Sequence, residues 1–213
     1  MEKERKATDV RTQVRTSGAA PGTEKPRGLA YNTMLGAVAL AAAVLFAVLF
    51  GVGKGVQSEY RQLDRVLAQG SDGSGYGVSY YEGGMEERAA NLCKIAGKSR
   101  YNGAFMVQTD AVRQAIQRAG EAQTAGALYD AVQDLIQTVD ALNEEMMDAG
   151  LDESDEAYRA SEYQNFTDQL FKLRNVAVDY NEQARDYNQN VLASFPASAL
   201  KGLLGLPEAE EFS

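Results

Sequence analysis

Residues 34–50 read MLGAVALAAAVLFAVLF, and they lie within a longer stretch, Leu29 to Gly53, that has no charged residue. A helix of about 20 apolar residues is long enough to cross the hydrocarbon core of a bilayer. Arg27 and Lys54 bound the uncharged stretch on its two sides. The sequence therefore predicts a transmembrane helix over residues 29–53.

Two other structures share some of these features. The buried core helix of a water-soluble protein rarely stays free of polar residues on every face. A cleaved signal peptide has a shorter apolar region, followed by a cleavage site with small residues. The run in this chain is longer than such a region, and no clean cleavage site follows it. The pattern favours a permanent membrane span over both alternatives.

The charges on either side of the span predict its orientation. Residues 1–28 have seven basic and four acidic residues, whereas the rest of the chain has 14 basic and 26 acidic residues. Basic residues close to a span are enriched on the cytoplasmic side. We therefore expect residues 1–28 to be a disordered basic tail in the cytoplasm, and the helical bundle after the span to lie outside the cell. An acidic outer domain is not expected to bind nucleic acid.

The segment that follows the span continues its helical pattern before glycine interrupts it. Val56, Tyr60, Leu63 and Leu67 share one helical face, which predicts that the membrane helix extends over residues 54–69. Residues 70–84 are rich in glycine and predict a loop. Because no proline lies between Gly28 and Phe195, the remaining chain can form long helices.

Three helices are predicted after the loop. The first covers about residues 85–98, and the second begins near Thr109 or Asp110 and ends at Gly150. The last has an apolar repeat of 3.5 residues, typical of a coiled-coil seam. Its seam is Phe166, Leu170, Leu173, Ala177, Tyr180, Ala184, Tyr187 and Val191. The predicted fold is all-α, with an N-terminal transmembrane helix followed by an antiparallel three- to four-helix bundle of long helices.

The C-terminal part of the chain contains a recurrent pattern of paired polar residues. Its members are Glu162-Tyr163-Gln164-Asn165-Phe166, Arg174, Tyr180-Asn181, Arg185-Asp186-Tyr187-Asn188, Phe195-Pro196, Leu203-Leu204-Gly205-Leu206 and Phe212. This pattern resembles the C-terminal signature of the LemA family. The resemblance implies a membrane-anchored antiparallel helical bundle over residues 85–213, and it implies no catalytic activity.

The signature residues are Tyr180, Asn181, Arg185, Tyr187, Asn188, Phe195 and Pro196. The two tyrosines lie on the predicted seam, and the two asparagines lie at its edge, where their amides can bond a neighbouring helix. Arg185 can pair with Glu182 or with an acidic residue of another helix. Two interpretations stay open: a recognition strip for a partner protein, or a structural role in helix register and docking of the tail.

The composition limits the chemistry of the chain. It has no histidine, which excludes Ser-His and Cys-His nucleophile pairs and imidazole metal ligands. Cys93 is the only cysteine and is expected to be a buried apolar residue. The acidic residues 152–156 can bind a divalent cation weakly or form a solvated loop at a helix start. We predict no catalytic residue, no cofactor and no metal site.

Two functions follow from these patterns. The first is a non-enzymatic interaction or scaffold module of the cell envelope, anchored in the bilayer through residues 29–53 and bound to a protein partner. The second is a cation-dependent sensor or enzyme with carboxylates between helices. Small residues in the span, Gly36 and Ala39 to Ala43, also permit homo-oligomerisation.

Overall fold

The computed structural model describes residues 27–213, and side chains from Thr33 onward. The predicted basic tail of residues 1–28 therefore lies almost entirely outside the described residues. The chain divides into two units, one that ends at Val44 and one that runs from Leu45 to Ser213. All the described elements are helical, in agreement with the predicted fold class.

The first helix, α1, spans Arg27–Gln69 and contains the predicted membrane segment and its extension. Its part from Thr33 onward is the one helix among the described residues that is long and apolar enough to cross a membrane. Most described apolar side chains of the predicted span make no contact that buries them within the protein. Val56 and Leu63, in contrast, are buried against the bundle. The described apolar side chains of α1 are therefore mostly exposed before Lys54 and form a buried stripe after it.

The loop after α1 is shorter than the predicted 70–84. The helix α2 spans Val78–Ala96, so residues 78–84 are helical and only residues 70–77 form the turn. Gly83 and Gly84 lie inside α2, although glycine disfavours helix interiors. Burial explains the difference, because Val78 and Met85 are fully enclosed in the core and hold this end of the helix in place.

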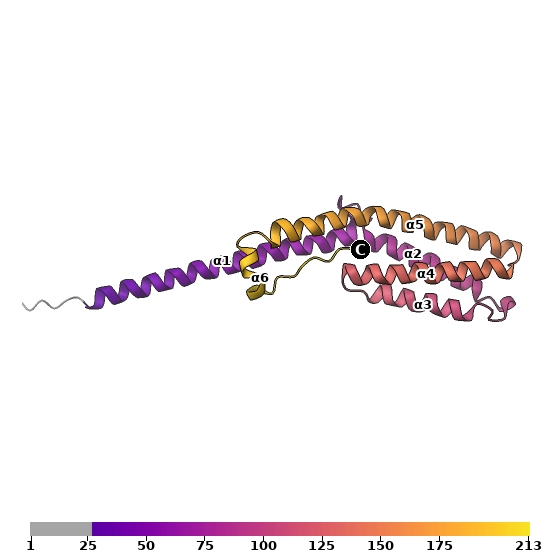
Figure 1. Cartoon of the computed structure of the whole chain (residues 1–213), viewed down its shortest axis with the longest axis horizontal. Helices are drawn as coiled ribbons and strands as arrows, with labels where there is room; N and C mark the ends of the chain where they lie inside the picture. The colour runs from indigo at the N-terminus through magenta and orange to yellow at the C-terminus, as the bar shows by residue number, and fades with distance from the viewer. Residues whose placement is uncertain (1–26) are drawn as a thin grey trace, which may run out of the picture. The chain divides into compact units, whose positions relative to one another are not determined.

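Four helices, α2 to α5, form the bundle, and each runs antiparallel to the next along the chain. After α2 come the 3₁₀ turn η1 (Ser99–Tyr101), α3 (Met106–Glu121), α4 (Ala125–Ala149) and α5 (Glu153–Asp186). Figure 1 shows the four helices side by side. The predicted apolar stripes form the core: the stripe of α4 is buried, and every seam residue of α5 and the following turn is buried or half-buried.

The predicted helix from about residue 109 to Gly150 is in fact two helices. The chain turns back at residues 122–124, between α3 and α4. The Thr124 hydroxyl accepts a hydrogen bond from the Ala127 backbone N–H (3.2 Å) and caps α4. This cap satisfies one of the unpaired donors of the helix start and makes the break stable. The apolar period of α4 alone carries no information about where the helix begins.

The last part of the chain doubles back along α5. The π-helical turn η2 (Tyr187–Leu192) continues α5, and the short helix α6 spans Ala197–Leu204. Residues 205–213 then run without regular structure, with Leu206, Ala209 and Phe212 buried. The apolar side chains of this tail belong to the same core as those of α1 and the bundle.

Candidate functional site

The predicted signature residues of the last helix meet at one place, where they hold the tail of residues 207–212. Tyr180, Asn181 and Arg185 lie near the end of α5, and Tyr187 and Asn188 begin η2. All five donate hydrogen bonds to the tail. We call the surface of α5 and η2 that binds residues 207–212, with the start of α4 beside Glu210 and Phe212, the tail groove.

The two asparagines bind the tail backbone in both directions. The Asn188 side-chain amide donates to the Ala209 carbonyl (2.8 Å), and its carbonyl accepts from the Ala209 N–H (3.0 Å). Asn181 makes the same pair of bonds with Phe212, at 3.0 and 2.7 Å. Each asparagine thus satisfies both polar groups of one tail residue, as a neighbouring β-strand does.

The two tyrosines add a second row of contacts. The Tyr187 hydroxyl donates to the Pro207 carbonyl (2.9 Å), and the Tyr180 hydroxyl donates to the Glu210 carbonyl (3.0 Å). Burial raises the pKa of Tyr180 to about 12, with smaller contributions from Tyr60 and nearby carboxylates. Its hydroxyl therefore keeps its proton, and remains a donor, throughout the physiological pH range.

The spacing of these contacts explains why the signature repeats after seven residues. Seven residues of an α-helix rise about 10.5 Å, and three residues of an extended chain cover about 9–10 Å. Tyr187 and Tyr180 bind residues 207 and 210, and Asn188 and Asn181 bind residues 209 and 212. The heptad of the helix therefore matches a three-residue period of the tail.

Charged groups add further contacts along the tail. The Arg185 guanidinium pairs with the Glu211 carboxylate of the tail (3.0 Å). The sequence instead predicts a pair with Glu182 or with an acidic residue of another helix. The Glu210 carboxylate accepts from the Gly126 N–H at the start of α4 (3.3 Å). A carboxylate is favoured at this position because unpaired N–H groups give a helix N-terminus partial positive charge.

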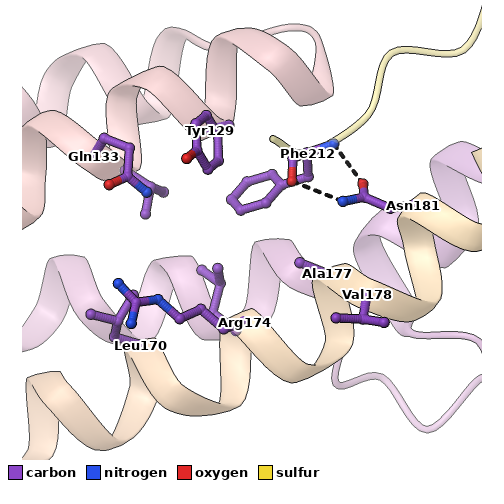
Figure 2. Close-up of a pocket in the computed structure, with 10 residues that line it drawn as sticks. Tyr129, Gln133, Leu170, Arg174, Ala177, Val178, Asn181 and Phe212 are labelled. Carbon is purple, nitrogen blue, oxygen red and sulfur yellow. Dashed lines mark hydrogen bonds between the residues drawn. The ribbon is translucent and has the colours of Figure 1, made fainter.

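The tail does not fill the groove. A pocket of about 280 Å³ lies beside Phe212, between α4 and α5. Figure 2 shows Phe212 next to Tyr129, with Gln133 of α4 and Arg174 of α5 further along. The rings of Tyr129 and Phe212 meet edge to face, with centroids 5.3 Å apart. The sequence patterns did not indicate Tyr129 or Gln133, because the apolar period places neither on the seam of α4.

Phe195 and Pro196, the remaining signature residues, lie outside the tail groove. Pro196 precedes the first residue of α6, and the Phe195 side chain is 85% exposed. Their peptide bond is cis. The structure therefore brings together five of the seven predicted residues and separates these two from them.

The predicted acidic loop is a helix start whose carboxylates are engaged by protein groups. Asp152 caps α5 by accepting from the Asp155 N–H (3.0 Å) and also pairs with Arg100. Asp155 is buried, pairs with Lys98 and accepts from the Tyr101 hydroxyl (2.6 Å). These bonds hold the pKa of Asp155 below its usual range. The structure thus shows what the acidic run does: it starts α5 and joins it to η1.

Potential reactive groups are few in the part of the chain that the structure describes. No group of three or more His, Cys, Asp or Glu side chains there is arranged to hold a metal ion. Cys93 is buried, as predicted, and burial raises the pKa of its thiol to about 11. A thiol with this pKa is a poor nucleophile near neutral pH, because the thiolate is the reactive form.

The sequence pattern did not indicate a buried glutamate, Glu82, that lies beside the half-buried Glu86 on α2. Glu82 is only 9% exposed and lies one helical turn before Glu86. Three buried side-chain oxygens here have no hydrogen-bond partner among the described residues: Oε1 of Glu82, Oε1 of Glu86 and the amide oxygen of Gln169 on α5. Burial, with the nearby Glu86, raises the pKa of Glu82 to about 8. Nothing in the local sequence distinguishes this glutamate from exposed ones, because its burial depends on how α2 packs.

We expect Glu82→Gln to stabilise the fold in alkaline solution. Because the pKa of Glu82 rises from 4.5 to about 8 on folding, the cost of its burial grows as the pH increases between these values. Removing the charge should raise the free energy of unfolding by about 1–2 kcal/mol near pH 8. This value is smaller than the full equivalent of the pKa shift, because water around the partly exposed Glu86 screens the interaction between the two carboxylates. Urea titrations followed by circular dichroism at several pH values measure this difference.

The matched control for this substitution is Glu87→Gln on the same helix. The Glu87 side chain is exposed, so its replacement should leave the pH dependence unchanged. A Glu82→Gln variant that is less stable than the parent protein both below pH 4.5 and near pH 8 would show that the carboxyl makes a favourable contact.

No family model matches the chain, and comparisons with curated proteins and with solved structures found no match.

Proposed function

We propose that this chain is a membrane-anchored, non-enzymatic interaction module of the LemA type, in which the tail groove is the binding surface. The proposal depends mainly on the way in which Asn181 and Asn188 hold the tail. Each binds the N–H and the carbonyl of a single residue, and these are groups that every extended peptide presents. Recognition through the backbone, with pockets for selected side chains, is a general mode of peptide binding.

The side chains of the tail indicate which peptides the groove accepts. Leu206, Ala209 and Phe212 are buried at intervals of three residues. A partner segment should therefore be extended, with a small residue flanked three positions away by apolar ones. The unfilled part of the pocket beside Phe212 contains the Arg174 side chain, which suits a carboxylate on the partner.

The tail then acts as a tethered competitor for the groove. A segment attached through a short connection has an effective concentration of about millimolar, so only a partner that binds well displaces it. In the proposed arrangement, α1 anchors the module in the cell membrane with its N-terminus in the cytoplasm. The groove then faces the outside, where it binds a protein partner of the cell envelope.

A peptide-binding experiment with the full chain in detergent micelles tests the groove. The variant Phe212→Ala weakens the docking of the resident tail, so a labelled peptide with the sequence of residues 203–213 should bind it more tightly than it binds the parent protein. Fluorescence anisotropy measures this affinity. Adding Asn181→Ala and Asn188→Ala should abolish binding, because both backbone contacts are lost.

Asn175→Ala serves as the matched control, since Asn175 is exposed on the same helix. It should leave the affinity unchanged. Absence of saturable binding to Phe212→Ala, or equal binding after removal of both groove asparagines, would rule out the tail groove as a peptide site.

A further inference from the structure

The segment from Ala193 to Leu206 presents an unusual surface for an acidic protein. Lys201 is its only charged residue, and this lysine is half-buried and paired with Glu208. The exposed described residues of the segment are all uncharged, and the two largest, Phe195 and Leu203, are 85% and 73% exposed. The complete set of exposed residues is Ala193, Ser194, Phe195, Ser198, Ala199, Gly202, Leu203 and Gly205.

This uncharged surface lies beside the part of α1 where its charge-free stretch ends. A Cβ atom added to Gly53 would lie 3.8 Å from Leu204 of α6. Phe46, Leu49 and Phe50 of α1 line an open groove of about 400 Å³ together with Leu204 and Leu206. Figure 1 shows α6 next to α1. Exposed apolar side chains therefore continue from α1 onto α6, and Lys54 is the one charged residue that lines the groove between them.

Lys54 marks the level at which α1 leaves the lipid. It is the first charged residue after the uncharged stretch, and its amino group lies 4.5 Å from the centroid of the Phe50 ring. A lysine in this position places its aliphatic stem along apolar surface and its ammonium among the headgroups. Leu204 lies close to Gly53, one residue before Lys54, so the proposed anchoring of α1 would place α6 at the height of the headgroups.

We propose that α6 and the preceding Phe195 insert into the membrane interface and form a second lipid contact beside the span. This inference rests on the proposed anchoring of α1 in the bilayer and goes beyond it, because it assigns a lipid-binding role to a segment outside the span. A short helix with an uncharged outer face can lie in the boundary between headgroups and acyl chains, about 5–10 Å deep. The contact holds the start of the tail at the membrane surface.

The absence of tryptophan from the chain makes the proposal directly testable. In vesicles of phosphatidylcholine and phosphatidylglycerol, the full-length variants Leu203→Trp and Phe195→Trp each have a single tryptophan, whose emission is excited selectively. Lipids brominated near the ester end of their acyl chains quench only tryptophans at that depth. We expect both variants to lose fluorescence in the vesicles with brominated lipids. We also expect them to emit at shorter wavelengths than variants with a tryptophan at an exposed position of the bundle.

Two exposed bundle positions provide matched controls for the two test positions. Val107→Trp, at the start of α3, has the same exposure as Leu203 (74% against 73%), and Phe171→Trp replaces an aromatic residue that is 66% exposed on α5. Neither control should be quenched. Leu45→Trp, nine residues before Lys54 and therefore about 13–14 Å deeper along the helix, is measured with lipids brominated near the methyl end of their acyl chains, and it reports whether the span itself is in lipid.

The pattern of quenching separates the two proposals. Quenching at residues 45, 195 and 203, but not at 107 and 171, supports the interfacial role of α6. Quenching at residue 45 alone overturns that role and leaves the anchoring of α1 intact, and equal quenching at all five positions overturns it as well. Absence of quenching at residue 45 overturns the membrane anchoring and, with it, the inference about α6.

Discussion

The double substitution Asn181→Ala and Asn188→Ala is expected to release the C-terminal tail while the four-helix bundle stays folded. The two side chains make four hydrogen bonds to the backbone of Ala209 and Phe212. At about 1 kcal/mol for each bond, their loss should lower the free energy of tail opening by roughly 3–4 kcal/mol. Both asparagines are half-buried at the edge of the core, so the seam of α5 should stay packed.

Hydrogen exchange and proteolysis both measure this release. The amide protons of Ala209 and Phe212 should exchange on the order of 10²–10³ times faster in the double variant. Glu208, Glu210 and Glu211 make the tail a substrate for a glutamate-specific protease, and cleavage there should accelerate in parallel. Circular dichroism should show the helix content of the parent protein.

Asn175→Ala removes an exposed asparagine from the same helix and should change neither rate. If the double variant exchanged and was cleaved at the rates of the parent protein, burial of Leu206 and Phe212 alone would hold the tail, and the asparagine contacts would contribute nothing measurable.

Gly77→Ala is expected to be the most destabilising single substitution in the turn between α1 and α2. A Cβ atom at residue 77 would lie 2.6 Å from the carbonyl carbon of Ala68 and 2.7 Å from the backbone nitrogen of Gln69, and it would also meet the Leu67 carbonyl oxygen. These are backbone atoms of the last turn of α1, which cannot rotate away as a side chain can. We expect a loss of about 3 kcal/mol in the free energy of unfolding.

Gly83→Ala is the matched control, with an expected effect of opposite sign. Nothing lies within 4 Å of a Cβ atom at Gly83, which is inside α2. Alanine should therefore stabilise the helix by about 0.5–1 kcal/mol. Urea denaturation of both variants measures the two changes. Equal stability of Gly77→Ala and the parent protein would show that the corner between α1 and α2 opens without cost.

The helical period of the sequence was sufficient to predict the buried faces of the bundle. Leu128, Val132 and Leu135 of α4, and Phe166, Leu173 and Ala184 of α5, are buried where their spacing placed them. The described part of the uncharged stretch, from Thr33 onward, likewise forms a helix whose apolar side chains are mostly exposed. These features are predictable because a residue's position around a helix depends only on its distance along the chain.

Contacts between distant parts of the chain decided the remaining features. The sequence singled out Tyr180, Asn181, Tyr187 and Asn188 but left open whether they recognise a partner protein or serve helix register and docking of the tail, because a side-chain amide can bond any backbone that reaches it. The break between α3 and α4, the start of α2 at Val78 and the burial of Glu82 also depend on packing. The sequence by itself thus determined the helical class and the apolar faces of the helices. Only the tertiary structure brought residues 207–212 against α5, some 20 to 31 positions earlier in the chain, because that pairing depends on the path of the connecting turn and not on a local period.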